Sequence, residues 1–358
     1  MADDLTHSSV PDQPDVAVPA TLDEALDPAW LSQALSSIGK GASVTSVEQV
    51  ELIKTVATKV RFAVTFEGSQ EKHSFCLKGL LDVDEMTARG GSTCVLEADF
   101  YCKVAPVVDI RVPECVAAIV DREAQQGVII MRDLIVDGAR FCSALEPFSA
   151  DDASASLEQL SRLHLRSNFL EGKDWIRPRA AELARMTYIT PEMLQDLLDG
   201  PRGDNLTPQV RDGSRLLAAM QELANRDERR RQFMIHGDSH AGNIFRTADG
   251  PGVIDWQLLQ RGGWALDVAY HLNAVLPTEV AQREERRLVE EYLQRMRAAG
   301  MEMPGDEEAW TQYREAVMYG YYLWAITRRV DPPIIVQFTD RLGKAVMRHG
   351  SHALLGIA

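Results

Sequence analysis

The sequence lacks any apolar run of 18 residues, and it is short of basic residues: 38 lysines and arginines stand against 53 acidic residues, a net charge of −15. The first absence argues against a membrane-spanning helix. The second argues against binding to nucleic acid or to anionic membranes, because both require a basic surface. We therefore expect neither nucleic acid nor membrane as a partner.

Cysteine is scarce as well. The five cysteines all lie in the first 142 residues, at spacings that match neither a disulfide framework nor a metal site. This pattern is typical of reduced, buried thiols in cytoplasmic proteins. The acidic start, Met1-Ala-Asp-Asp, has no basic and apolar leader character. A cytoplasmic location is the expectation that follows.

Composition and patterning favour a folded protein with two parts. Hydrophobic residues make up 45% and charged residues 25% of the 358-residue chain, which is ordinary for a globular protein and long enough for two cores. Residues 1–20 are rich in Asp, Pro and Ser and are expected to form a disordered tail. Strand-type patterns occupy residues 21–131, and helical patterns dominate residues 132–358. The sequence therefore predicts an α+β protein.

One segment carries the clearest chemical signal. It reads Phe233-Met-Ile-His-Gly-Asp238-Ser-His-Ala-Gly-Asn243-Ile-Phe, and Val-Ile-Asp255-Trp-Gln follows it. Phosphoryl transfer needs a carboxylate that aligns the acceptor hydroxyl and hard oxygen ligands that hold magnesium at the nucleotide phosphates. Asp238 is the candidate for the first role. Asn243 and Asp255 are the candidate magnesium ligands, and the pattern predicts a phosphotransferase.

A second interpretation uses some of the same residues. His236, Asp238 and His240 alternate along an extended segment, so their side chains would share one face, as the ligands of hydrolytic zinc sites often do. The sequence has no other cluster of His, Cys and Asp of similar density. A zinc-dependent hydrolase is therefore the less favoured alternative.

Three motifs in one order give a family resemblance. They are His236-Gly-Asp-Ser-His-Ala-Gly-Asn243, Ile254-Asp-Trp-Gln257 and Gly262-Gly-Trp-Ala-Leu-Asp267-Val-Ala, all within 35 residues. This set resembles the aminoglycoside phosphotransferase and choline kinase family, in a bacterial branch similar to ecdysteroid-kinase-like small-molecule kinases. The resemblance implies a two-lobed protein-kinase-like fold, with a small antiparallel β-sheet lobe and a larger, mostly helical lobe. It also implies ATP and Mg²⁺ as cofactors, and a structural role for Asp267 beneath the catalytic loop.

A kinase of this type needs a nucleotide-binding lobe before the motif. Three strand-type runs occur there, at residues 44–53, 60–66 and 74–80. Lys78 lies in the third run between apolar residues, where a kinase lysine would contact the nucleotide phosphates. Glu97 lies beside the apolar stripe of a predicted helix over residues 94–104 and is the expected partner of Lys78, with Asp99 as the second candidate. By the same analogy, the strand that ends at Met131 leads into an adenine-binding hinge at Asp133.

The phosphate loop departs from the kinase pattern. Residues 54–59 read Lys-Thr-Val-Ala-Thr-Lys and contain no glycine, although kinase-like loops use bare backbone amides to approach phosphates. The departure keeps open a nucleotide-binding protein of the same fold without transfer activity. Our prediction remains an ATP- and Mg-dependent kinase that phosphorylates a hydroxyl of a small organic molecule. The sequence leaves open whether this is an aminoglycoside, an amino alcohol, a macrolide, a steroid-like alcohol or a hydroxyacyl thioester.

Overall fold

The computed structural model describes residues 10–55, 57–88 and 90–357, and the chain in it divides into two compact units. The first unit comprises Met1–Arg140 and Gly252–Leu258, and the second comprises Phe141–Pro251 and Leu259–Ala358. The first nine residues of the expected tail lie outside the described residues. Within its remainder, Asp12 forms a parallel bridge with Ala117.

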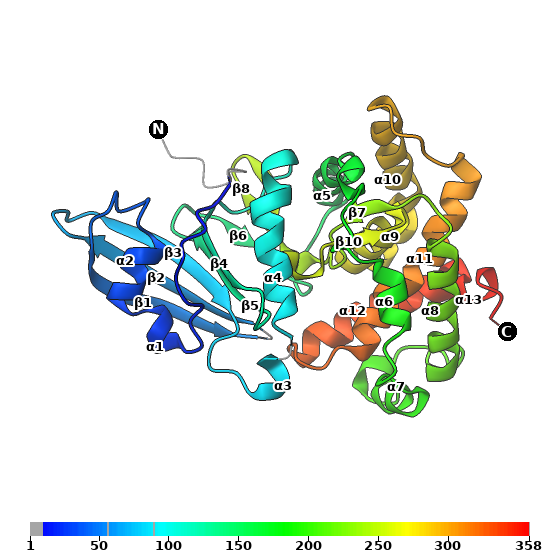
Figure 1. Ribbon diagram of the computed structural model, residues 1–358. Helices are drawn as coiled ribbons and strands as arrows, with labels where there is room; N and C mark the ends of the chain where they lie inside the picture. The colour runs from blue at the N-terminus through cyan, green and yellow to red at the C-terminus, as the bar shows by residue number, and fades with distance from the viewer. Residues whose placement is uncertain (1–9, 56, 89, 358) are drawn as a thin grey trace. The chain divides into compact units, whose positions relative to one another are not determined.

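The first unit is built on a five-stranded antiparallel sheet in the order β1-β2-β3-β5-β4 (Figure 1). Its strands are β1 (Val44–Lys54), β2 (Thr58–Phe66), β3 (Lys72–Gly79), β4 (Cys115–Asp121) and β5 (Gln126–Arg132). Alternate residues of β2, from Val60 to Phe66, are buried in the core of the unit, as the period of two predicts. The three strand-type runs of the sequence correspond to β1, β2 and β3.

Short helices accompany the sheet. They are α1 (Leu22–Ala25), α2 (Pro28–Ala34), α3 (Glu85–Ala88), α4 (Ser92–Asp99), η1 (Phe100–Val104) and η2 (Ala105–Val107). Helix α2 packs against β1, and α4, cyan in Figure 1, packs against β5. The helix expected over residues 94–104 is thus α4 continued by a π-helical turn, η1, and Pro106 follows where a proline stops a helix.

Residues 252–258 belong to the first unit although they are distant from it in sequence. The Val253 amide donates to the carbonyl of Arg111 at 2.8 Å. The indole of Trp256 stacks on Phe100 of η1, with ring centroids 3.7 Å apart. Asp255 is therefore placed by contacts on both sides of it within this unit.

The second unit is mainly helical. Its helices are α5 (Ala150–His164), η3 (Ser167–Leu170), α6 (Arg179–Ala184), α7 (Pro191–Leu198), η4 (Pro201–Gly203), α8 (Gly213–Asp227), η5 (Ala241–Asn243), α9 (Trp264–Val275), α10 (Thr278–Ala298), α11 (Asp306–Ile326), α12 (Pro332–His349) and α13 (Ser351–Leu354). Every residue of α9 is buried, and α5, α10, α11 and α12 pack around it (Figure 1). Helix α9 is mainly apolar for this reason, with Asp267, His271 and Asn273 as buried polar residues.

The segment that carries Asp238 and Asn243 follows a short buried strand of this unit. Strand β7 (Phe233–Ile235) pairs antiparallel with β10 (Gln260–Gly262). The strands β6 (Arg140–Phe141), β8 (Ile244–Thr247) and β9 (Gly250–Val253) form a further small sheet, and η6 (Trp256–Leu258) precedes β10. Among the described residues, no helix is both long and apolar enough to cross a bilayer. The predicted combination of an antiparallel sheet with a larger helical part is confirmed.

Candidate active site

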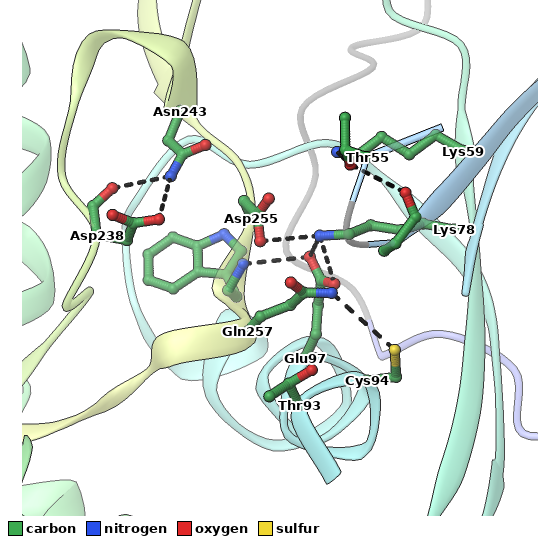
Figure 2. Close-up of polar contacts among 12 residues, drawn as sticks. Thr55, Lys59, Lys78, Thr93, Cys94, Glu97, Asp238, Asn243, Asp255 and Gln257 are labelled. Atoms are coloured by element: carbon green, nitrogen blue, oxygen red, sulfur yellow. Dashed lines mark hydrogen bonds and ion pairs between the residues drawn. The ribbon is translucent and has the colours of Figure 1, made fainter. Parts of the chain in front are cut away.

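Lys78 is the centre of a buried ion-pair group in the first unit. Its side chain is 3% exposed, and its Nζ lies 2.7 Å from Glu97 Oε2 and 2.9 Å from Asp255 Oδ1 (Figure 2). Burial alone lowers the pKa of Lys78, but the two carboxylates outweigh it and raise that pKa above its ordinary value. The lysine therefore stays charged, and its ammonium is held at a fixed point.

Two backbone features fix the carboxylates of this group. Glu97 Oε1 accepts the Trp256 amide at 3.2 Å, which ties α4 to the segment that carries Asp255. Asp255 has a φ of +65°, a left-handed conformation that few residues other than glycine, asparagine and aspartate adopt readily. The second candidate, Asp99, pairs instead with Lys103 and Arg122. Glu97 is the acidic residue of α4 that contacts Lys78.

The structure adds Lys59 to this group. Lys59 of β2 is the cross-strand partner of Lys78 on β3, and its Nζ donates to Thr55 Oγ1 at 3.4 Å (Figure 2). Burial and the charge of Lys78 lower the pKa of Lys59. From the sequence, Lys54 or Lys59 could add charge to the glycine-free loop, and the register of β2 on β3 is the signal that places Lys59 beside Lys78. Residue 56 of that loop lies outside the described residues.

The two hinge candidates lie at the end of β5. Met131 pairs with Cys76 and Cys115 on the neighbouring strands, and its sulfur accepts the Tyr101 hydroxyl at 3.5 Å. Asp133 is buried, and its carboxylate accepts Arg61 Nε at 3.0 Å and the Ile135 amide at 3.0 Å. The Asp133 side chain therefore holds β5 to β2, so a role in adenine binding would use backbone groups here.

In the second unit, Asp267 holds the loop that carries Asp238. The buried Asp267 carboxylate accepts the amides of His236 at 2.7 Å and Gly237 at 2.9 Å, and His164 Nε2 lies 3.2 Å from it. Burial raises the pKa of Asp267, but the hydrogen bond and charge of His164, with further donors, bring it below the ordinary value. Gly237 has a φ of +79°, so this tight loop requires glycine.

The Asp238 carboxylate is held at both oxygens. The Tyr270 hydroxyl donates to Oδ1 at 3.0 Å. Asn243 Nδ2 donates to Oδ2 at 3.3 Å and to the Asp238 carbonyl at 2.8 Å (Figure 2). The side chain of Asp238 is 27% exposed, in contrast to the fully buried Asp267. Its carboxylate is thus oriented by neutral donors while it remains accessible to a ligand.

The histidines expected for a zinc site do not converge on one point. His236 is buried, and its Nδ1 accepts the Asp238 amide at 3.1 Å. His240 Nδ1 accepts the Gly242 amide at 3.0 Å. Within residues 10–55, 57–88 and 90–357, no three His, Cys, Asp or Glu side chains are grouped as a metal site would require. The zinc interpretation gains no support.

A family model described as "Phosphotransferase enzyme family" matches residues 109–305, which is more than half of the chain. The chain belongs to this family. The match includes Asp238, Asn243, Asp255 and Asp267, and the predicted family and the predicted enzyme class, a phosphotransferase, are confirmed. None of the curated proteins matches the chain.

Solved structures of similar fold come from several organisms. An ethanolamine kinase of Plasmodium vivax is 13% identical, with 88% of this chain and 87% of that chain covered and a TM-score of 0.50. A choline kinase of Cryptosporidium parvum is 11% identical over 93% of both chains, with a TM-score of 0.48. A choline/ethanolamine kinase family protein of Mesorhizobium loti is 16% identical over 90% of this chain and 97% of that chain, with a TM-score of 0.45. The likeness to the Plasmodium enzyme confirms the predicted kinase-like fold.

Proposed function

We propose that this phosphotransferase is a kinase that moves the γ-phosphoryl group of magnesium-bound ATP to a hydroxyl of a small organic molecule. The observation that carries the proposal is the Asp238 carboxylate, which is oriented by Tyr270 and Asn243 and is partly exposed. A carboxylate in this state is suited to align an acceptor hydroxyl and to take its proton.

The first unit is proposed as the nucleotide-binding part, and the second as the part that carries the catalytic loop and the acceptor site. Lys78 and Lys59 bring two ammonium groups to one face of β2 and β3. The Lys78 ammonium is held by two ion pairs, so its orientation is settled before the nucleotide binds, which suits a partner of the α- and β-phosphates. Lys59 adds a second positive charge beside it. Backbone groups near Met131 and Asp133 are proposed to bind the adenine.

Asn243 and Asp255 are proposed as the magnesium ligands, and each fits that role in its own unit. Asn243 turns its amide nitrogen to Asp238, so its amide oxygen points elsewhere and is the group it offers to a cation (Figure 2). The Asp255 side chain is 24% exposed, and its Oδ1 forms the ion pair with Lys78 Nζ. These are the hard oxygen donors that magnesium prefers, and the ion, when bound, would neutralise charge on the phosphate oxygens.

In the proposed transfer, the acceptor oxygen forms a bond to the γ-phosphorus. At the same time, the bond between the γ-phosphorus and the β–γ bridging oxygen breaks, and ADP leaves. The acceptor proton passes to Asp238 Oδ2, which is the oxygen not engaged by Tyr270. Lys78 stabilises the negative charge on the phosphates through its fixed ammonium.

An aromatic cluster packs against His240, beside Asp238. The ring of His240 lies 5.3 Å from the rings of Trp324 and Phe338 and 6.4 Å from Tyr270, and His240 Nε2 is 3.6 Å from Asp238 Oδ2. Trp324, Phe338 and Tyr270 are buried, whereas the His240 side chain is 16% exposed. Aromatic rings pack against apolar groups, so the His240 ring is proposed to contact the carbon skeleton of the acceptor.

The test is phosphoryl transfer from magnesium ATP to a panel of alcohols that includes ethanolamine, choline, a steroid alcohol, a macrolide and an aminoglycoside. Product is identified as a phosphate ester by phosphorus NMR, and ADP release gives the rate. Asp238→Asn should lower the turnover by about 10³-fold, because it removes the proton acceptor, while ATP affinity stays near that of the wild type. An active Asp238→Asn variant would contradict the proposal. Tight ATP binding without transfer across the panel would support the nucleotide-binding alternative instead.

A further inference from the structure

Tyr270 joins the catalytic loop to helix α11. Its side chain is fully buried on α9, and its hydroxyl oxygen lies 3.0 Å from Asp238 Oδ1 and 2.7 Å from Trp324 Nε1. All three residues lie in the second unit. The hydroxyl therefore has one partner on the catalytic loop and another on α11.

The chemistry of these groups fixes the direction of each hydrogen bond. An indole N–H only donates, so the Tyr270 oxygen accepts from Trp324. The hydroxyl proton must then point at the other partner, Asp238 Oδ1, which as a carboxylate oxygen accepts. Burial and the charge of Asp238 raise the pKa of Tyr270 well above its ordinary value, so the phenol keeps the proton that this arrangement requires.

Helix α11 is shaped to admit the Tyr270 ring. Gly320 lies within this helix, where glycine is unfavourable by about 1 kcal/mol relative to alanine. A Cβ at this position would come within 2.5 Å of Tyr270 Cδ2 and 3.0 Å of a Leu342 methyl. The ring of Tyr319 also packs edge-on against Tyr270 at 5.9 Å. The ring is held in place on several sides, so its hydroxyl has little freedom.

We propose that Tyr270 and Trp324 are positioning residues for phosphoryl transfer: a directed hydrogen-bond relay from Trp324 through Tyr270 holds Oδ1 and so fixes the orientation of the Asp238 carboxylate, whose Oδ2 takes the acceptor proton. This inference rests on the proposed role of Asp238. Without the relay, Oδ1 loses the Tyr270 hydroxyl, and the carboxylate has a wider range of orientations about χ2, although Asn243 still contacts Oδ2. The relay is expected to act on turnover, because it changes neither the Lys78 group nor any other contact within the first unit.

The kinetic test uses a double-mutant cycle, with magnesium ATP as donor and both water and the best alcohol of the panel as acceptors. Tyr270→Phe should lower kcat by roughly 10- to 100-fold, the effect of a misplaced reacting group, with the KM for ATP within about 2-fold of the wild type. Trp324→Phe removes the indole donor and should lower kcat by roughly 3- to 10-fold. Because Trp324 acts through Tyr270, its substitution should have no further effect in the Tyr270→Phe background.

Tyr321→Phe is the matched control. Tyr321 is a buried tyrosine of α11 whose hydroxyl donates to the Val210 carbonyl at 2.9 Å, a hydrogen bond of similar length that does not involve Asp238. Tyr321→Phe should lose about as much stability as Tyr270→Phe and keep the wild-type kcat. Equal rate losses from Tyr270→Phe and Tyr321→Phe, or a loss on Trp324→Phe that persists in the Tyr270→Phe background, would overturn the positioning role.

A second measurement does not depend on activity. The protein has six tryptophans, so nitrogen-15 tryptophan labelling gives six indole signals, and the Trp324 signal is the one missing from Trp324→Phe. Tyr270→Phe should move this signal upfield, since the indole loses its acceptor, and Tyr321→Phe should leave it in place. A signal that does not respond to Tyr270→Phe overturns the relay. A wild type that phosphorylates neither water nor any alcohol, yet gives the expected indole shift, overturns the proposed function and leaves the hydrogen-bond chain established.

Discussion

In the first unit, Lys78 lies between the carboxylates of Glu97 and Asp255, whereas in the second unit Asp267 accepts two backbone amides and lies beside His164. Both centres place ionised groups out of water. The first balances charge with charge, and Asp255 keeps an exposed portion. The second balances one carboxylate with His164 and two backbone amides, and it is closed to solvent.

The difference matches two different tasks. Charged groups that remain partly accessible can exchange protein partners for a ligand's phosphates or for a cation, because their charge is not fully satisfied within the fold. A carboxylate enclosed by backbone amides has no such exchange to make, and it fixes the path of the chain instead. We infer that the first centre serves ligand binding and the second serves the shape of the catalytic loop.

The strongest way to break this comparison is to remove the charge at the first centre. Lys78→Ala leaves Glu97 and Asp255 as neighbouring carboxylates without their cation, and it should lower kcat/KM for ATP by roughly 100-fold. Unfolding in urea should show a loss of about 3 kcal/mol, since breaking a buried pair from one side is costly. Unchanged nucleotide kinetics would exclude Lys78 from the site.

Lys72→Ala is the matched control on the same strand. Lys72 of β3 pairs with Glu48 at 2.6 Å, but both side chains are more than 60% exposed. An exposed pair contributes little to stability because water screens it. The control should therefore keep wild-type nucleotide kinetics and the wild-type unfolding midpoint, and the contrast with Lys78→Ala measures the effect of burial.

A smaller effect is expected at the second centre. In Asp267→Asn, the amide nitrogen cannot accept, so either His236 or Gly237 loses the acceptor of its buried amide. One such unsatisfied donor is worth about 1–3 kcal/mol of stability, and the displaced loop should lower kcat by roughly 10-fold. Urea unfolding and steady-state kinetics with the best alcohol measure the two effects.

Asp227→Asn tests whether a loss of kcat is specific to the aspartate that holds the catalytic loop or follows from changing a buried aspartate. Asp227 is a second buried aspartate of this unit, and it accepts the Gly263 amide at 2.9 Å, away from the catalytic loop. Burial raises the pKa of Asp227 to about 6, the opposite direction to Asp267, so its charge is poorly compensated near neutral pH. Asp227→Asn should keep its kcat and lose little stability. A large kcat loss here would show that any buried aspartate of the unit affects turnover.

The residues of the candidate site differ in how well the sequence predicts them. Asp238 and Asn243 lie five residues apart in one loop, so their spacing alone indicated a shared site. Lys78 and Glu97 were expected by analogy with kinases, and local patterns supported them: the apolar neighbours of Lys78 and the apolar stripe beside Glu97.

The features that the sequence did not predict depend on packing between segments that are distant in sequence. Tyr270 looks like an ordinary core aromatic of an apolar helix until α9 and α11 are brought together, and Lys59 needs the register of β2 on β3. The same holds for residues 252–258, which join the first unit through Trp256 and Phe100. Gly320 is a signal in the sequence that could have indicated the close approach of Tyr270, because a glycine inside a long helix requires a reason.

The smallest expected effect concerns pH, and it tests whether the second centre tolerates an added charge. His271 of α9 is fully buried, its Nδ1 lies 2.7 Å from the Ser239 carbonyl, and its Nε2 has no hydrogen-bond partner among the described residues. A carbonyl only accepts, so Nδ1 carries the proton of the neutral ring. Burial lowers the pKa of His271 to about 4 from an ordinary value of 6.5. Protonation would place an unpartnered N–H and a charge in the core.

A base with a lowered pKa in the folded state is protonated first in the unfolded state, so folding stability is complete above pH 6.5 and falls as the pH drops toward 4. Between pH 7.5 and pH 5 the loss from His271 should be about 2 kcal/mol. His271→Asn keeps a donor for the Ser239 carbonyl and cannot titrate, so its urea unfolding should vary less with pH by that amount. His352, whose pKa burial also lowers to about 4, contributes the same slope to both proteins and cancels in the difference. Parallel pH profiles for the two proteins would mean that the core behind the catalytic loop accommodates the charge, and the contrast between the two centres would then rest on Asp267 alone.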